Sequence, residues 1–99
     1  MKRQVIYAPL AREEFEDAVA WYEGQRPGLG DEFKTEVGET LRQILRSPER
    51  FRLVAPNIHK ATVQRFPYSV YFSIELSTIH VVSVFHGARN PMKLLRRLN

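Results

Sequence analysis

The chain has 99 residues, about the size of one small domain, so we expect a single core over residues 1–99 and no second catalytic domain. Hydrophobic residues make up 43% of it and cysteine is absent, which is typical of a globular cytoplasmic domain and excludes disulfides, thiolate metal sites and thiol nucleophiles. The formal net charge is +4, acidic residues come too early for a signal peptide, and no apolar run approaches the roughly 20 residues that span a membrane.

The first part of the sequence predicts a strand followed by a helix. Residues 4–7 (QVIY) are β-branched and aromatic, and Ala8-Pro9 ends the strand. Pro9 suits the first turn of a helix. Apolar residues then recur at spacings of three and four, at Ala11, Phe15, Ala18, Val19 and Tyr22. We therefore expect a helix over residues 10–23.

A second helix is predicted after a tight turn. Residues 24–30 (GQRPGLG) contain three glycines and a proline, which break a helix and reverse the chain. Asp31 suits a helix N-terminus, and Ser47-Pro48 ends the helix. Its apolar face comprises Leu29, Phe33, Val37, Leu41, Ile44 and Leu45. Two amphipathic helices joined in this way form an αα-hairpin, whose apolar faces need another layer to cover them.

The second half of the sequence predicts that layer. Strands are expected over residues 58–66, 69–75 and 78–86, the last with apolar residues on both faces, as in a central strand. A short helix is expected over residues 92–98. The predicted fold class is α+β, in the order β-α-α-β-β-β, with an αα-hairpin packed on a small, mostly antiparallel sheet.

The charge is distributed unevenly along the chain. Residues 1–50 carry eight Lys/Arg and ten Asp/Glu, a net charge of −2. Residues 51–99 carry seven Lys/Arg against one acidic residue, a net charge of +6, and all three histidines. A basic half either forms a solvated surface or attracts an anionic partner such as RNA, DNA or an acidic polypeptide.

Four motifs, in this order, resemble the RelE/ParE superfamily of type II toxins. They are AVAWYEGQRPGLGDEF at residues 18–33, Ser47-Pro48, RFPYSVYFSIE at residues 65–75 and VFHGARNP at residues 84–91. The resemblance covers nearly the whole chain and is closer to the ParE-like branch. It implies a cytoplasmic toxin that a cognate antitoxin neutralises. It also implies that the chain contacts operator DNA only through the antitoxin and has no cofactor.

The superfamily divides by target, and both branches remain open for this sequence. ParE-like members are described as poisoning DNA gyrase, whereas RelE-like members cleave ribosome-bound mRNA. Cleavage without a metal needs a proton-transfer group and cations around the phosphate. The candidates are His86, Arg89, Arg65 and Lys60. However, Ser69 or Val70 stands where RelE-type enzymes carry an arginine, and neither tyrosine nor histidine follows His86.

If the chain acts by binding, its basic residues are the candidates for contact with the target or the antitoxin. These are Arg89, Lys93, Arg96, Arg97, Arg42 and Arg46. An inactive toxin-fold binder is a third possibility. Trp21 and Tyr22 are expected to pack in and around the core rather than to stack bases, and Arg65 is expected to pair with Glu75 across the sheet. No metal site is expected, because the histidines lack ligand spacing.

Overall fold

The computed structural model describes residues 3–87, in which two α-helices and five strands form an α+β fold. The elements are β1 (Gln4–Tyr7), α1 (Pro9–Gln25), α2 (Leu29–Arg46), the 3-10 helix η1 (Pro48–Arg50), β2 (Arg52–Ala55), β3 (Ile58–Thr62), β4 (Tyr68–Glu75) and β5 (Thr78–His86). The predicted order is confirmed, with one strand more than the sequence predicted. The helix expected over residues 92–98 lies outside the described residues.

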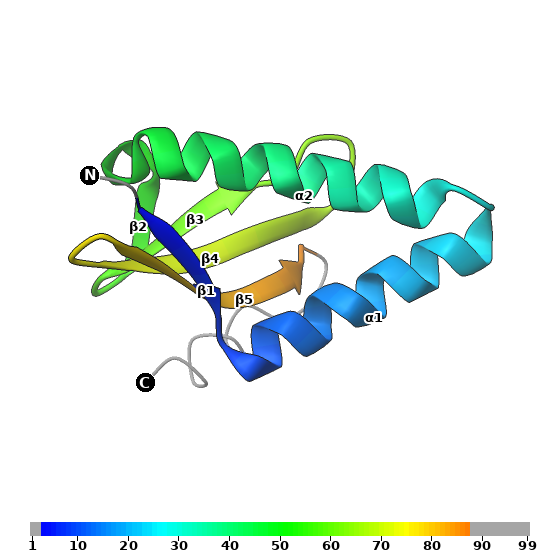
Figure 1. The fold of residues 1–99 in the computed structure, drawn as a ribbon, viewed down its shortest axis with the longest axis horizontal. Helices are drawn as coiled ribbons and strands as arrows, with labels where there is room; N and C mark the ends of the chain where they lie inside the picture. The colour runs from blue at the N-terminus through cyan, green and yellow to red at the C-terminus, as the bar shows by residue number, and fades with distance from the viewer. Residues whose placement is uncertain (1–2, 88–99) are drawn as a thin grey trace.

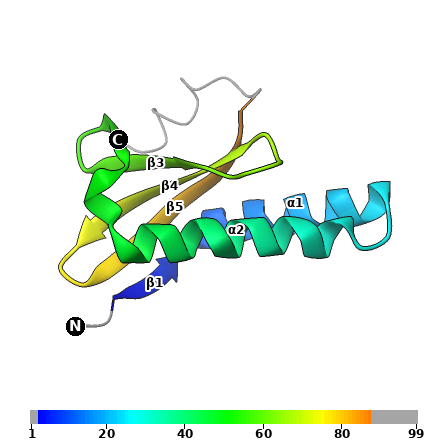
Figure 2. The same cartoon turned by 90° about the horizontal axis from the view of Figure 1, so that it is seen from above.

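The five strands form one sheet in the order β1-β5-β4-β3-β2. β1 pairs with β5 in parallel, and the other neighbours pair antiparallel, so the sheet is mostly antiparallel as predicted. α1 and α2 form the expected hairpin and cover one face of the sheet (Figures 1 and 2). The two faces of the sheet therefore have different environments, which decides where each candidate side chain points.

The turn and the end of β3 were placed wrongly, and one strand was missed. Gly24 and Gly30 lie inside the helices, so the turn is shorter than the glycines suggested. β3 ends at Thr62 rather than at residue 66, because the chain bends there and Arg65 adopts a positive φ of 70°. β2 (RLVA) was missed because it has one β-branched residue and no aromatic one, unlike the equally short β1 (QVIY).

The turn between the helices is held by the Glu23 carboxylate at the end of α1. Its oxygens accept hydrogen bonds from the backbone N–H groups of Gly28 (2.9 Å) and Gly30 (3.0 Å), which start α2. A helix N-terminus has unpaired N–H groups and favours negative charge, so this contact satisfies both requirements. Gly28 has a φ of 90°, a conformation that side-chain-bearing residues rarely adopt.

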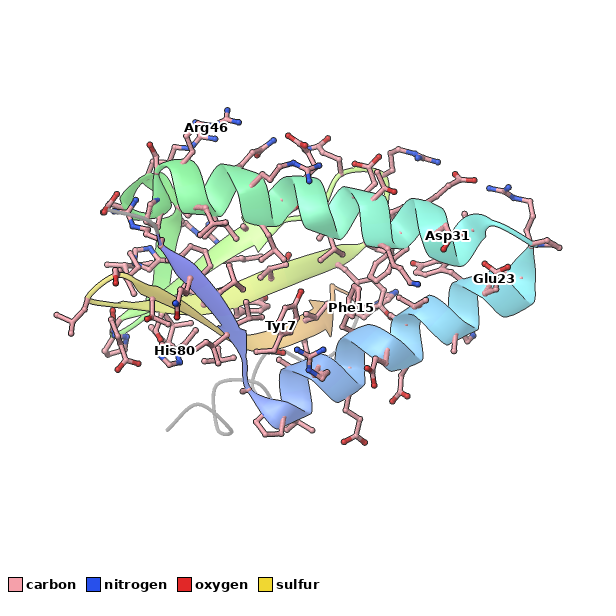
Figure 3. All side chains as sticks on the ribbon, viewed as in Figure 1. Tyr7, Phe15, Glu23, Asp31, Arg46 and His80 are labelled. Carbon is pink, nitrogen blue, oxygen red and sulfur yellow. The ribbon has the colours of Figure 1, made fainter. Side chains whose placement is uncertain are left out.

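An aromatic cluster of Tyr22, Phe33, Phe66 and Tyr68 joins both helices to the sheet. Its ring centroids are 4.8–6.1 Å apart, within the range of favourable ring packing. Phe33 is fully buried, and Tyr22 and Phe66 are nearly so. Side chains on the inner sides of the helices fill the space between the layers (Figure 3). The cluster fixes the end of α1 against β4.

The approach of the two helices requires glycine at position 30. A Cβ atom there would lie 2.8 Å from the backbone oxygen of Val19 and 2.9 Å from Glu23 Oε1. We therefore expect Gly30→Ala to lower the free energy of unfolding by about 1–2 kcal/mol, since overpacking outweighs the gain in helix propensity. Urea unfolding measures the difference.

The matched control is Gly24→Ala, because a Cβ at that position meets no atom within 4 Å. Its stability should be unchanged or higher by up to about 1 kcal/mol. If both variants behave alike, close packing of the helices at Gly30 is not what limits stability.

Candidate functional site

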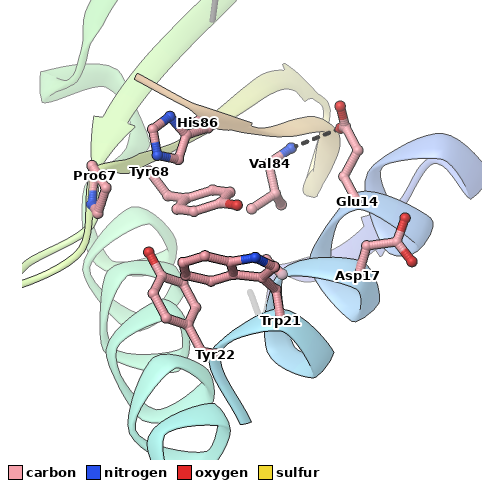
Figure 4. A pocket seen from close by; sticks show the side chains of 9 residues that line it. Glu14, Asp17, Trp21, Tyr22, Pro67, Tyr68, Val84 and His86 are labelled. Atoms are coloured by element: carbon pink, nitrogen blue, oxygen red, sulfur yellow. Dashed lines mark hydrogen bonds between the residues drawn. The ribbon is translucent and has the colours of Figure 1, made fainter. Parts of the chain in front are cut away.

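An open groove of about 490 Å³ lies between α1 and the ends of β4 and β5 (Figure 4). It exists because β1 is short: β1 pairs with β5 only from Thr78 to Val81, and residues 82–86 of β5 extend beyond it. α1 runs beside this part of β5 where a longer β1 would have paired. The lining residues are Glu14, Asp17, Ala18, Trp21, Tyr22, Pro67, Tyr68, Val84 and His86.

Aromatic rings form much of the groove's surface. Trp21 packs edge-on against Tyr22 from one wall, and Tyr68 packs edge-on against His86 from the other, each pair with centroids 5.1 Å apart. Tyr22 is buried as expected, whereas Trp21 is 60% exposed. Burial, and then the neighbouring Tyr68, raises the pKa of Tyr22 above 10.0, so its hydroxyl keeps its proton at neutral pH.

The charged side chains of the groove are acidic. Glu14 Oε1 accepts hydrogen bonds from the backbone N–H of Val84 (3.1 Å) and from Ser83 Oγ (2.9 Å), which satisfies the β5 edge where β1 has ended. Asp17 is exposed and has no ion pair or hydrogen bond with the described residues. Of the described residues, no Lys or Arg lines the groove. The groove therefore favours positive charge.

Lys60 lies on the opposite face of the sheet from His86. In the strand register, Lys60 faces Tyr71, and His86 faces Tyr68. Residues 68 and 71 lie on opposite faces because side chains alternate along a strand. Lys60 also faces Arg52 of β2, so two cations and a phenol form a row on the face away from the helices. Burial raises the pKa of Tyr71, although the charge of Arg52 acts in the other direction.

Arg65 binds α2 and not the sheet, so the expected pairing with Glu75 was wrong. Its guanidinium lies 2.7 Å from Glu32 Oε1 and 3.4 Å from Glu36 Oε2. The positive φ of Arg65, in the bend that follows β3, directs the side chain toward the helix. Glu75 instead lies 3.8 Å from Nε2 of His80. Arg65 is thus tied to the hairpin, away from both Lys60 and His86.

The remaining predicted cations lie on α2 or outside the described residues. Arg42 donates two hydrogen bonds to Glu39 (3.0 and 2.8 Å). Arg46 is exposed and extends away from the sheet (Figure 3). Arg89, Lys93, Arg96 and Arg97 lie beyond residue 87 and outside the described residues. Within the described range, therefore, His86, Lys60 and Arg65 do not share one surface.

Two further findings concern metals and membranes. In residues 3–87, no three His, Asp or Glu side chains gather as metal ligands would. His59 is buried, stacks on Phe72, and places Nδ1 2.8 Å from the carbonyl oxygen of Phe51, so its contacts are structural. Neither helix of the described part is both long and apolar enough to cross a membrane.

Comparison with known proteins agrees with this fold. The sequence matches the family model described as "ParE toxin of type II toxin-antitoxin system, parDE" over residues 5–91. The chain belongs to the ParE toxin family. Among solved structures, it is similar to a chain of the chromosomal ParDE toxin–antitoxin system from P. aeruginosa, with a TM-score of 0.74 and 13% identity over 87% of this chain and 96% of that one. No curated protein matches.

The family assignment confirms the resemblance in the sequence, and the similarity to the solved structure extends only to the fold. The groove of this ParE-family chain was not predicted, although the sequence contains a signal for it. Asp17 and Trp21 are four residues apart, so they lie on one face of α1. The apolar periodicity drew attention to Tyr22 and the core instead. That β1 ends early enough to leave the groove open followed only from the strand register.

Hydrogen bonds to Arg65, then to Arg26, lower the pKa of Glu32 below its ordinary value of 4.5. Arg65→Gln should therefore raise the pKa of Glu32 toward 4.5, only in part because Arg26 remains. Since the folded pKa lies below the unfolded one, the interaction stabilises the fold above about pH 4.5, and this contribution is lost as pH falls through the folded pKa. The stability difference between wild type and variant should narrow in acid.

NMR titration of the side-chain carboxyl carbons measures the pKa of each carboxylate, and urea unfolding at several pH values measures the stability difference. Arg42→Gln is the matched control: it should raise the pKa of Glu39, which Arg42 lowers by its hydrogen bonds, and leave Glu32 unchanged. An unaltered Glu32 titration in Arg65→Gln would show that the ion pair does not form in solution.

Proposed function

We propose that this ParE-family chain is a growth-inhibiting toxin domain over residues 1–99, which acts in the cytoplasm by poisoning DNA gyrase and is neutralised by a cognate antitoxin. The family match over residues 5–91 supports a type II toxin. The placement of the candidate catalytic residues supports gyrase over RNA as the target. The sheet separates Lys60 from His86, and Arg65 is held by two carboxylates of α2.

Gyrase poisoning requires a surface that binds the enzyme, and the basic residues are the candidates for it. The basic segment after the sheet carries Arg89, Lys93, Arg96 and Arg97. On α2, Arg46 is exposed and its charge acts on Glu39 without a direct ion pair, while Arg42 pairs with Glu39 directly. We assign contact with gyrase to the basic segment first. The antitoxin would mediate any contact with operator DNA.

Cleavage of ribosome-bound mRNA is the second candidate, and one observation favours it. Arg52 and Lys60 lie directly opposite each other on neighbouring strands, and no described carboxylate pairs with either. Like charges in such a pair repel unless an anion binds there. Tyr71 lies next to Lys60 and keeps its proton, so it is able to act as an acid. A nuclease of this kind would use Lys60 and not His86.

The two candidates are separated by incubating the purified chain with DNA gyrase, plasmid and ATP, and separately with translating ribosomes. We expect linear plasmid to accumulate and messages to stay intact. Lys60→Gln and His86→Gln should retain plasmid cleavage, because neither residue acts catalytically. Arg97→Glu should reduce plasmid cleavage by about tenfold or more, because the new carboxylate would then repel the acidic groups of gyrase that the arginine is proposed to contact.

Lys34→Glu is the control for the charge reversal, since Lys34 is an exposed cation at the start of α2, 3.8 Å from Asp31. This variant should cause as much gyrase-mediated plasmid cleavage as the wild type. Message cleavage that Lys60→Gln abolishes would establish the nuclease instead. If neither gyrase nor messages respond, the chain is an inactive toxin-fold binder.

A further inference from the structure

The groove beside α1 combines an exposed aromatic ring, Trp21, with a carboxylate, Asp17, that has no ion pair within the described part of the chain. Trp21 leaves 60% of its surface exposed, and Asp17 lies one helical turn away on the same face. Asp17 has no ion pair or hydrogen bond with the described residues. Arg12, the one cation of α1, lies over the ring of Tyr7 instead. An exposed indole is the most favourable of the aromatic rings for a cation. The helix wall thus presents both a ring face and a carboxylate.

The wall of the groove opposite α1 limits which chemical group fits between that wall and Trp21. Tyr68, Pro67 and Val84 give it an apolar surface, and the His86 ring stands edge-on to Tyr68 (Figure 4). A group that enters between this wall and Trp21 needs flat apolar faces, and its edge must carry positive charge toward Asp17. A guanidinium meets both requirements, since it stacks on rings and donates two parallel hydrogen bonds to a carboxylate. An ammonium ion is a point charge with stronger hydration and has no such face.

We propose that the groove binds an arginine side chain of the antitoxin, which stacks on Trp21 and pairs with Asp17, with apolar neighbours of that arginine against Tyr68 and Pro67. This inference rests on the proposed pairing with an antitoxin and assigns one of its contact sites. The antitoxin is the partner because the family match implies one, and an arginine of a polypeptide complements both the exposed ring and the acidic charge that line the groove.

The charge around the groove argues against a nucleic acid in the same place. α1 carries five acidic residues, at positions 13, 14, 16, 17 and 23, against Arg12 alone. A phosphate backbone that followed this helix would meet negative charge along its length. A basic segment of polypeptide meets attraction instead. The antitoxin segment that enters here therefore has to carry positive charge, in contrast to the segment that neutralises the basic residues after the sheet.

The chain contains a single tryptophan, so its fluorescence reports on the groove alone. The probe is the peptide acetyl-Ala-Leu-Arg-Leu-Ala-amide, compared with the same peptide containing citrulline, which has the shape of arginine without its charge. We expect a saturable change in Trp21 emission with the arginine peptide and affinity weaker by about tenfold for the citrulline peptide, the loss of one charge-assisted contact.

Asp17→Asn should weaken binding of the arginine peptide by a similar factor and leave binding of the citrulline peptide unchanged. This result assigns the contact to the Asp17 carboxylate and the guanidinium. Glu16→Gln is the matched control, because Glu16 is an exposed neighbour on α1 that does not line the groove. The proposal would be overturned if both peptides bound with equal affinity, or if Glu16→Gln lost as much affinity for the arginine peptide as Asp17→Asn. A stronger response to a single-stranded oligonucleotide than to the arginine peptide would also overturn it.

The same preparations are assayed for gyrase-mediated plasmid cleavage without peptide. If the peptide fails to bind while plasmid is cleaved, the arginine site is wrong and the proposed toxin activity stands. If the peptide binds selectively and gyrase is unaffected, the arginine site stands and the proposed target is wrong. Both failures are thus told apart in one set of samples.

Discussion

The early end of β1 is the constraint on which the arrangement of this domain depends. β1 pairs with β5 from Thr78 to Val81 and then turns into α1, so β1 does not cover the outer edge of residues 82–86. Buried backbone groups at such an edge need partners. Glu14 supplies one by accepting the N–H of Val84, and this contact holds α1 beside β5. At its other end, α1 is fixed by the aromatic cluster around Tyr22. The groove is the space left between these two points of attachment.

Most of the fold could be predicted from local pattern, and the errors have identifiable physical causes. The apolar periodicity located both helices, and β-branched runs located β1 and β5 with the correct bounds. Glycine was the misleading signal: Gly30 was assigned to the turn, but it lies inside α2, where the close approach of Val19 requires a residue without a Cβ. β2 escaped notice because its residues, RLVA, have little β-branched or aromatic character, so only its pairing with β3 identifies it as a strand.

The functional residues were harder to predict because they depend on which face of the sheet each side chain occupies. Lys60 and His86 were candidates for one surface, and a register that places residues 68 and 71 on opposite faces separates them. Arg65 was expected to pair within the sheet, yet its positive φ turns it to the carboxylates of α2. The basic residues after the sheet were recognised from composition alone. In the described part of the chain, acidic and aromatic groups lie together beside α1, which fits a protein that works through its surfaces.

The central claim is that the chain stops growth by trapping gyrase on DNA and not by cutting messages. The most direct measurement is to induce the wild-type chain in growing cells and, from one culture, to map the 5′ ends of translated messages and the gyrase-linked breaks in DNA. We predict that DNA breaks accumulate while the messages remain whole. Messages cut within codons, with DNA topology normal, would contradict the account and would make the row of Arg52, Lys60 and Tyr71 the active surface.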